Sequence, residues 1–136
     1  MRLITDDALG IMATWAEAEG EPFEGKCAVG EVIRRRAVLK YNARTPTIAS
    51  VLVTPYQFSF FNMDPGDRAR LTKALQIDTT DPVVDECRRA WEQSETSDYS
   101  KGAVLYYNPA AVVTAPAWAL VYPMVAQIGR HRFHKP

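Results

Sequence analysis

Four carboxylate side chains lie between Trp15 and Gly25, the densest cluster of acidic residues in the chain: Glu17, Glu19, Glu21 and Glu24. The cluster falls at the junction between two predicted helices. Acidic residues at the beginning of a helix satisfy backbone donors and oppose the positive end of the helix dipole, which is the simplest interpretation of Glu21 and Glu24. Glu19 is expected to point into solvent.

Glu17 differs from the other three acids. It directly follows Trp15 and Ala16, at the edge of the apolar stripe in the last turn of the first predicted helix. Burial and the negative helix end both raise the pKa of a carboxyl group, as a general acid near neutral pH requires. Spacing alone leaves open a structural role at the helix end.

Capping residues and apolar periodicity predict the elements that would hold this cluster. Thr5 or Asp6 caps a helix over about 6–18, and Gly20 is expected to end it in the left-handed conformation. The chain then offers signals for a long helix from Pro22 past Arg34-Arg35-Arg36, a short helix between Pro46 and Thr54, and helices after Asp64-Pro65 and Asp81-Pro82. The arginine run, like Arg88-Arg89, is interpreted as a solvated helix face.

Beyond Lys101 the pattern changes to strands. Runs at 103–107 and 125–133, the second broken at Gly129, are typical of β-structure. We therefore predict a single α+β domain over residues 1–136. Two distant cysteines, Cys27 and Cys87, are interpreted as reduced core thiols.

Charge and hydropathy exclude several classes of protein. The chain has 16 basic and 16 acidic residues, so no global positive field favours nucleic acid. No apolar run is long enough to span a membrane, and the first residues do not form a secretory signal. His131 and His134 lie three apart without supporting ligands, so neither a metal nor another cofactor is expected.

Short motifs in a fixed order carry a family resemblance. Glu17-Ala18-Glu19-Gly20-Glu21-Pro22-Phe23-Glu24-Gly25 resembles the opening signature of the SleB/CwlJ-type cell wall hydrolases, the spore cortex-lytic enzyme family. The likeness continues through Gln57-Phe58-Ser59, Tyr107-Asn108-Pro109, Trp118 and Ile128-Gly129-Arg130-His131-Arg132-Phe133. Two positions depart from the family pattern: Glu19 stands where an Arg is usual, and His134 where a Tyr is usual.

The resemblance implies a lysozyme-like fold, with a mainly helical body and a small antiparallel sheet near the C-terminus. It places the catalytic acid at Glu17 and implies a lytic transglycosylase that cuts the β-1,4 bond between N-acetylmuramic acid and N-acetylglucosamine. One carboxyl group then suffices, because the sugar's own C6 hydroxyl attacks and a 1,6-anhydro product forms. Glu17 would donate a proton first and later accept one. A hydrolytic mechanism would need a second carboxylate, for which Glu24, Asp64 and Asp67 are candidates.

Glycan strands require fixed polar groups and aromatic platforms. The candidates for binding them are Gln57, Phe58, Ser59, Tyr107, Asn108, Trp118 and His131, with Glu21 and Glu24 in supporting roles. Each also has a structural interpretation: Gln57 and Ser59 as loop anchors, Asn108 as a turn residue and His131 as a hydrogen-bonded structural histidine.

The expected partner is therefore the glycan strand of peptidoglycan, bound by a monomer without membrane insertion. A protein made in the cytoplasm without a signal would reach the wall by holin-assisted release, in a phage particle, or through a spore route. The alternatives are a hydrolytic muramidase, an amidase, or a module that binds peptidoglycan or assembles into a virion without cutting.

Overall fold

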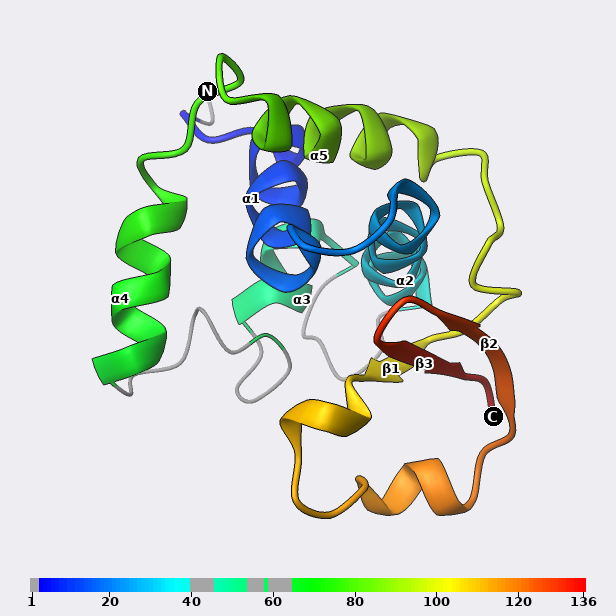
Figure 1. Ribbon diagram of the computed structural model, residues 1–136. Helices are drawn as coiled ribbons and strands as arrows, with labels where there is room; N and C mark the ends of the chain where they lie inside the picture. Colours follow the sequence, from blue (N-terminus) through cyan, green and yellow to red (C-terminus); the bar gives the residue numbers. More distant parts are fainter. Residues whose placement is uncertain (1–2, 40–45, 54–57, 59–64) are drawn as a thin grey trace.

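The computed structural model describes residues 3–39, 46–53, 58 and 65–136, which form a helical body beside a small sheet (Figure 1). The helices are α1 (Asp6–Ala18), α2 (Phe23–Leu39), α3 (Ile48–Val53), α4 (Pro65–Ala74) and α5 (Pro82–Gln93). Three strands follow, β1 (Leu105–Tyr107), β2 (Met124–Ile128) and β3 (His131–His134), with the 3-10 helices η2 (Pro109–Ala111) and η3 (Ala117–Leu120) between β1 and β2. The α+β prediction is confirmed.

Local capping explains where the helices begin. Thr5 accepts a hydrogen bond from the Ala8 backbone N–H at 3.1 Å, and Asp81 accepts one from Val83 at 2.9 Å. The end of α1 corrects the sequence-based expectation. Glu19 closes the helix in the right-handed conformation, and among the described residues positive φ angles occur at Lys101, Gly102 and Gly129 but not at Gly20.

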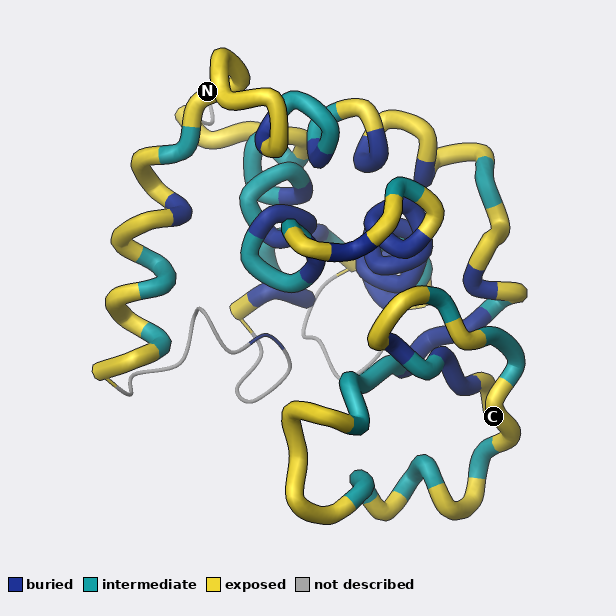
Figure 2. Tube along the Cα trace, in the orientation of Figure 1, coloured by how far each residue is buried: buried dark blue, intermediate teal, exposed yellow. Residues whose placement is uncertain are grey.

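Helix α2 is the centre of the body, and Figure 2 shows it as the most continuously buried element. Helices α1, α3 and α5 pack around it, so most of its residues are buried, including the polar residues Lys26, Glu31 and Arg36. Cys27 on α2 and Cys87 on α5 are buried free thiols, as predicted. Burial raises the pKa of each thiol to about 11.

The close approach of α1 and α5 depends on Gly10. A Cβ at this position would lie 2.2 Å from the Trp91 ring, so only hydrogen fits there. Trp91 is fully buried, and its indole N–H donates to Asp7 Oδ1 at 2.9 Å. This contact sets the first helix against the fifth.

The arginine run of α2 is not the solvated face that the sequence indicated. Arg34 stacks on the Trp91 ring at 3.8 Å and donates to the Trp91 carbonyl. Arg35 donates to the Ala103 carbonyl, and the buried Arg36 donates to the Val104 carbonyl at 2.6 Å. Arg34 thus attaches α5 to α2, and Arg35 and Arg36 attach the chain segment before β1 to α2.

The buried Glu31 of α2 also holds the segment before β1, at residues 97–100. Its carboxylate, 2% exposed, accepts hydrogen bonds from the Ser97 hydroxyl, the Tyr99 backbone N–H and both the backbone and hydroxyl of Ser100, at 2.5 to 3.1 Å. A buried carboxylate is tolerated when its lone pairs are filled by donors in this way. The entry into β1 is therefore rigidly positioned.

The sheet is antiparallel with strand order β1-β3-β2. Tyr106 pairs with Phe133, and both side chains face the helical body. The opposite face carries Tyr107 and His134, which pack with Trp118 of η3 at ring-centroid distances of 5.2 to 5.8 Å.

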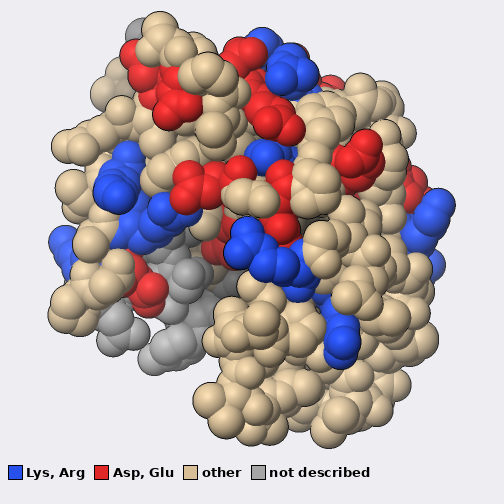
Figure 3. Space-filling model, in the orientation of Figure 1, with Lys and Arg blue, Asp and Glu red and all other residues tan. Residues whose placement is uncertain are grey.

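Charged residues are unevenly distributed over the sequence and the surface. The chain has no charged residue between Lys101 and Arg130, and Figure 3 shows the corresponding uncharged lobe beside a body that carries intermixed acidic and basic groups. Within the described residues, every helix is too short or too polar to cross a bilayer.

Candidate active site

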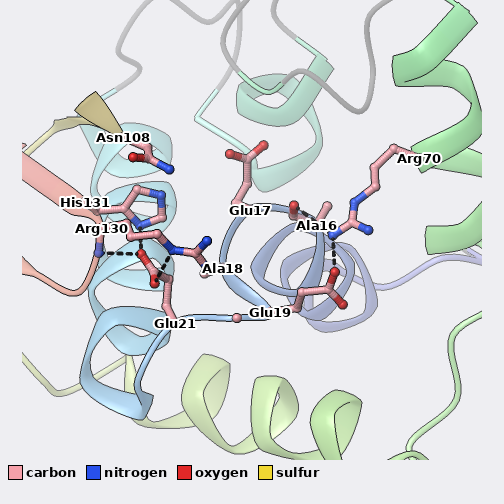
Figure 4. Close-up of a pocket in the computed structure, with 10 residues that line it drawn as sticks. Ala16, Glu17, Ala18, Glu19, Glu21, Arg70, Asn108, Arg130 and His131 are labelled. Atoms are coloured by element: carbon pink, nitrogen blue, oxygen red, sulfur yellow. Dashed lines mark hydrogen bonds and ion pairs between the residues drawn. The ribbon is translucent and has the colours of Figure 1, made fainter. Parts of the chain in front are cut away.

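A pocket of about 230 Å³ lies where the end of α1, the junction with α2, α4 and the β2–β3 turn meet (Figure 4). Its lining is strongly polar and includes most of the acidic cluster seen in the sequence. The lining residues are Ala16, Glu17, Ala18, Glu19, Gly20, Glu21, Arg70, Asn108, Arg130 and His131.

Glu17 lies in the last turn of α1 and is half-buried. Desolvation by burial raises the pKa of its carboxyl group from 4.5 to about 7. The hydrogen bond from Tyr106 and the charges of Arg36 and Arg70 lower this pKa, whereas Asp67 raises it, and burial outweighs them. The group is thus divided between acid and carboxylate near neutral pH.

Among the described residues, Tyr106 is hydrogen-bonded to this carboxyl group, whereas the sequence pointed to its neighbour Tyr107 as the site residue. The Tyr106 hydroxyl donates to Glu17 Oε2 at 3.1 Å. The signal available was the alternation of a strand, which sends Tyr106 and Tyr107 to opposite faces. Alternation alone does not tell which of the two tyrosines faces the helices.

Glu21 connects the α1–α2 junction to the β2–β3 turn. Its carboxylate accepts the Arg130 backbone N–H at 2.9 Å and lies 3.4 Å from Arg130 Nε and 3.3 Å from His131 Nδ1. The expected role of Glu21 as an acceptor of backbone donors is therefore correct in kind, but the donor comes from another element. Lys26, itself buried, donates to the Glu21 carbonyl at 2.6 Å.

Glu19 does not point freely into solvent as expected. Its carboxylate pairs with Arg70 Nη2 of α4 at 2.8 Å, and the same guanidinium donates to the Ala16 carbonyl at 3.3 Å. Arg70 also stacks over the Trp15 ring at 4.1 Å. Glu19, which stands where the family usually has an arginine, therefore holds Arg70 at the pocket.

The structure brings some of the predicted binding residues to the pocket and leaves others away from it. Asn108 and His131 line it together with Glu17. Tyr107 and Trp118 pack on the opposite face of the sheet, and Phe58 is a core residue at 1% exposure. Glu24 is exposed on the first turn of α2 and does not line the pocket. Gln57, Ser59 and Asp64 lie outside the described residues.

The two histidines near the C-terminus face different surroundings. His131 packs against Tyr106 and Phe133, whereas His134 packs against Tyr107 and Trp118. Within the described ranges, no group of three His, Cys, Asp or Glu side chains could hold a metal ion.

Comparison with known proteins identifies the family of the chain. A family model described as Cell Wall Hydrolase matches residues 20–134, a stretch that begins after Glu17. The chain is 30% identical over 128 residues to a spore cortex-lytic enzyme of Oceanobacillus iheyensis and 30% identical over 133 residues to one of Bacillus subtilis. These alignments cover 90% and 94% of this chain but 39% and 37% of the relatives, so the chain spans about two fifths of their length.

Two solved structures share the fold. The catalytic domain of the Bacillus cereus SleB protein superposes with a TM-score of 0.73 at 24% identity, over 96% of this chain and 89% of that one. The catalytic domain of the germination-specific lytic transglycosylase SleB from Bacillus anthracis gives a TM-score of 0.72 at 23% identity, over 96% and 93%. The predicted lysozyme-like architecture is confirmed, and the chain belongs to the cell wall hydrolase family.

Proposed function

We propose that this chain cleaves the glycan strands of peptidoglycan, at the β-1,4 bond between N-acetylmuramic acid and N-acetylglucosamine, with Glu17 as the catalytic acid. The observation that carries the proposal is the state of Glu17: it lines an open polar pocket, is held by Tyr106, and has a pKa of about 7. A carboxyl group that keeps its proton near neutral pH can protonate a departing glycosidic oxygen.

The surroundings of Glu17 support a lytic transglycosylase. Most glycoside hydrolases use a second carboxylate as base or nucleophile. In the described lining, the other two carboxylates are already bound, Glu19 by Arg70 and Glu21 by the Arg130 turn. Attack by the sugar's own C6 hydroxyl avoids that requirement, and the product carries a 1,6-anhydro ring.

The substrate is the cell wall, and the curated relatives are named for the spore cortex. We favour cortex peptidoglycan as the substrate, with phage delivery to a vegetative wall, by holin or in the particle, as the alternative route. Purified cortex and vegetative sacculi, digested in parallel, distinguish the two substrates.

The decisive experiment is mass spectrometry of the soluble fragments released from purified peptidoglycan. Wild-type protein is expected to release anhydro-muropeptides, and Glu17→Gln none. Glu95→Gln, an exposed substitution of the same type away from the pocket, is the matched control and should behave as wild type.

Other products would overturn the proposal in distinct ways. Fragments with reducing ends would identify a muramidase, and free peptides an amidase. Binding to sacculi without any release, equal in wild type and Glu17→Gln, would identify a non-catalytic module.

A further inference from the structure

His131 occupies a position in the pocket that its resemblance-based role in binding sugar does not explain. It is the first residue of β3, directly after the turn at Arg130, and its side chain is 8% exposed. Its ring packs against the Tyr106 ring in a T-shaped arrangement, with a centroid distance of 5.0 Å. The tyrosine that binds Glu17 through its hydroxyl thus touches His131 through its ring.

The two ring nitrogens of His131 have different surroundings. Nδ1 is buried, and its nearest polar partner among the described residues is Glu21 Oε1 at 3.3 Å, a contact less directional than an ideal hydrogen bond. Figure 4 shows the other nitrogen, Nε2, directed to the side of the pocket where Asn108 lies. A neutral imidazole with its proton on Nδ1, facing a carboxylate, presents the Nε2 lone pair to the pocket.

The charged groups around the ring favour this neutral form. Burial lowers the pKa of His131, Glu21 raises it and Arg130 lowers it, with burial the largest of the three effects. Tyr106, on the remaining side, is a neutral phenol whose own pKa burial raises well above the usual value. His131 is therefore able to accept a proton at the pH where Glu17 still holds one.

We propose that His131 is a second catalytic residue, with Nε2 accepting the proton of the hydroxyl that attacks the anomeric carbon and Glu21 stabilising the imidazolium. This inference rests on the proposed function and replaces the scheme in which Glu17 takes that proton back. The arrangement resembles the histidine–carboxylate pairs of other enzymes, in which a buried carboxylate orients the ring.

The step balances without an added reactant. The Glu17 proton moves to the glycosidic oxygen as the bond from that oxygen to the anomeric carbon breaks. The C6 hydroxyl oxygen forms the new bond to the same carbon, and its proton moves to His131 Nε2. The enzyme is left with a Glu17 carboxylate and a His131 imidazolium, and one proton passing from the second to the first restores the starting state.

The variant His131→Asn separates this role from a structural one. The asparagine amide can occupy the place of Nδ1 and donate to Glu21, but it has no basic nitrogen at Nε2. His134→Asn is the matched control, because it removes the other histidine of β3 from the opposite face of the sheet. Thermal melts of both variants establish that they fold.

The readout is the pH dependence of glycan cleavage at limiting substrate. Wild type should give a bell-shaped profile of cleavage rate against pH. The rate should fall above about pH 7 as Glu17 ionises, and fall below the lowered pKa of His131 as the ring becomes protonated. His131→Asn should lose the acidic limb, keep the alkaline limb, and react about 100-fold more slowly, the usual loss on removing a general base. His134→Asn should keep both limbs.

Specific results would overturn the inference. An acidic limb that persists in folded His131→Asn, or a rate within about threefold of wild type, would mean that Glu17 and not His131 accepts the proton of the attacking hydroxyl. If His131→Asn does not fold, His131→Gln takes its place, since its longer side chain still lacks a base. Absence of any glycan cleavage by wild type would instead refute the proposed function, which keeps the two failures distinct.

Discussion

Tyr106 donates its hydroxyl to Glu17 Oε2 at 3.1 Å and so joins the first strand to the last turn of the first helix. The pairing of Tyr106 with Phe133 in the sheet fixes which tyrosine faces the helix. A slip of one residue in this register would send Tyr107 to Glu17 and turn Tyr106 away. The position of the candidate acid is therefore coupled to the register of a three-stranded sheet.

Replacing Tyr106 by Phe should raise the pKa of Glu17 further. The hydroxyl bond favours the charged carboxylate, so it opposes the effect of burial. Without it, we expect the alkaline limb of activity to move above pH 7 and the Glu17 carboxyl signal in NMR to titrate at higher pH. Tyr99→Phe, at an exposed tyrosine, is the control and should leave both unchanged. A pKa of Glu17 that falls or stays in Tyr106→Phe would contradict the assigned direction.

The raised pKa of Glu17 also predicts a dependence of stability on pH. Below 4.5 both folded and unfolded chains hold the proton, so burial of the neutral acid has no ionisation cost. Between 4.5 and about 7 the folded chain binds more protons than the unfolded chain, so the free energy of unfolding falls as pH rises and is constant above that range. The shift corresponds to about 3 kcal/mol.

Glu17→Gln removes this cost. The variant should therefore be more stable than wild type by up to about 3 kcal/mol near pH 8 and nearly equal to it near pH 4. Urea unfolding at both pH values measures the difference. An equal gain at both would mean that ionisation of Glu17 is not its source.

The features that could be predicted from the sequence are those that depend on residues close together along the chain. The caps at Thr5 and Asp81 and the placement of Glu17 in the last helical turn follow from residues within one turn of each other. The pocket depends on contacts between distant segments: Glu19 meets Arg70, and Glu21 meets Arg130. No local pattern specifies which arginine approaches which acid.

Two errors have the same origin. The sequence predicts a solvated face at 34–36 because clustered charge on a helix is usually exposed. Instead Arg34 donates to the Trp91 carbonyl of α5, and Arg35 and Arg36 donate to backbone carbonyls of the segment leading into β1. The sequence also predicts a left-handed stop at Gly20 because glycine commonly ends helices, yet α1 ends in the right-handed conformation at Glu19, and Gly20 has no positive φ.

Glu31→Gln should destabilise the protein while leaving the pocket residues unaltered. The glutamine amide replaces one acceptor oxygen by a donor, which would face the hydroxyl and N–H donors of the 97–100 segment. Hydrogen bonds to charged groups and the cost of unpaired buried donors together give about 3 kcal/mol. Chemical unfolding measures the loss, and hydrogen exchange should report faster opening of the amides of Tyr99 and Ser100.

Glu92→Gln is the control for Glu31→Gln. Glu92 is exposed on α5 and pairs with Arg88 at 2.9 Å across one helical turn, a type of contact that contributes less than 1 kcal/mol. If the two substitutions cost the same, the buried carboxylate does not organise the segment before β1.

The turn between β2 and β3 gives the last prediction, because it holds Arg130 and His131 against Glu21. Gly129 has φ +54°, and a Cβ there would lie 2.9 Å from both Glu21 Oε2 and Pro22 Cδ. Gly129→Ala is therefore strained by its backbone and by its new contact, and should cost about 2 kcal/mol. Gly66→Ala is the matched substitution on α4, where no atom of the described residues lies within 4 Å of the added Cβ and alanine should stabilise the helix by up to about 1 kcal/mol. Thermal unfolding of the two variants should shift in opposite directions, and in Gly129→Ala glycan cleavage should fall as Glu21 is displaced. Equal shifts, or full activity in Gly129→Ala, would show that the turn does not hold the pocket together.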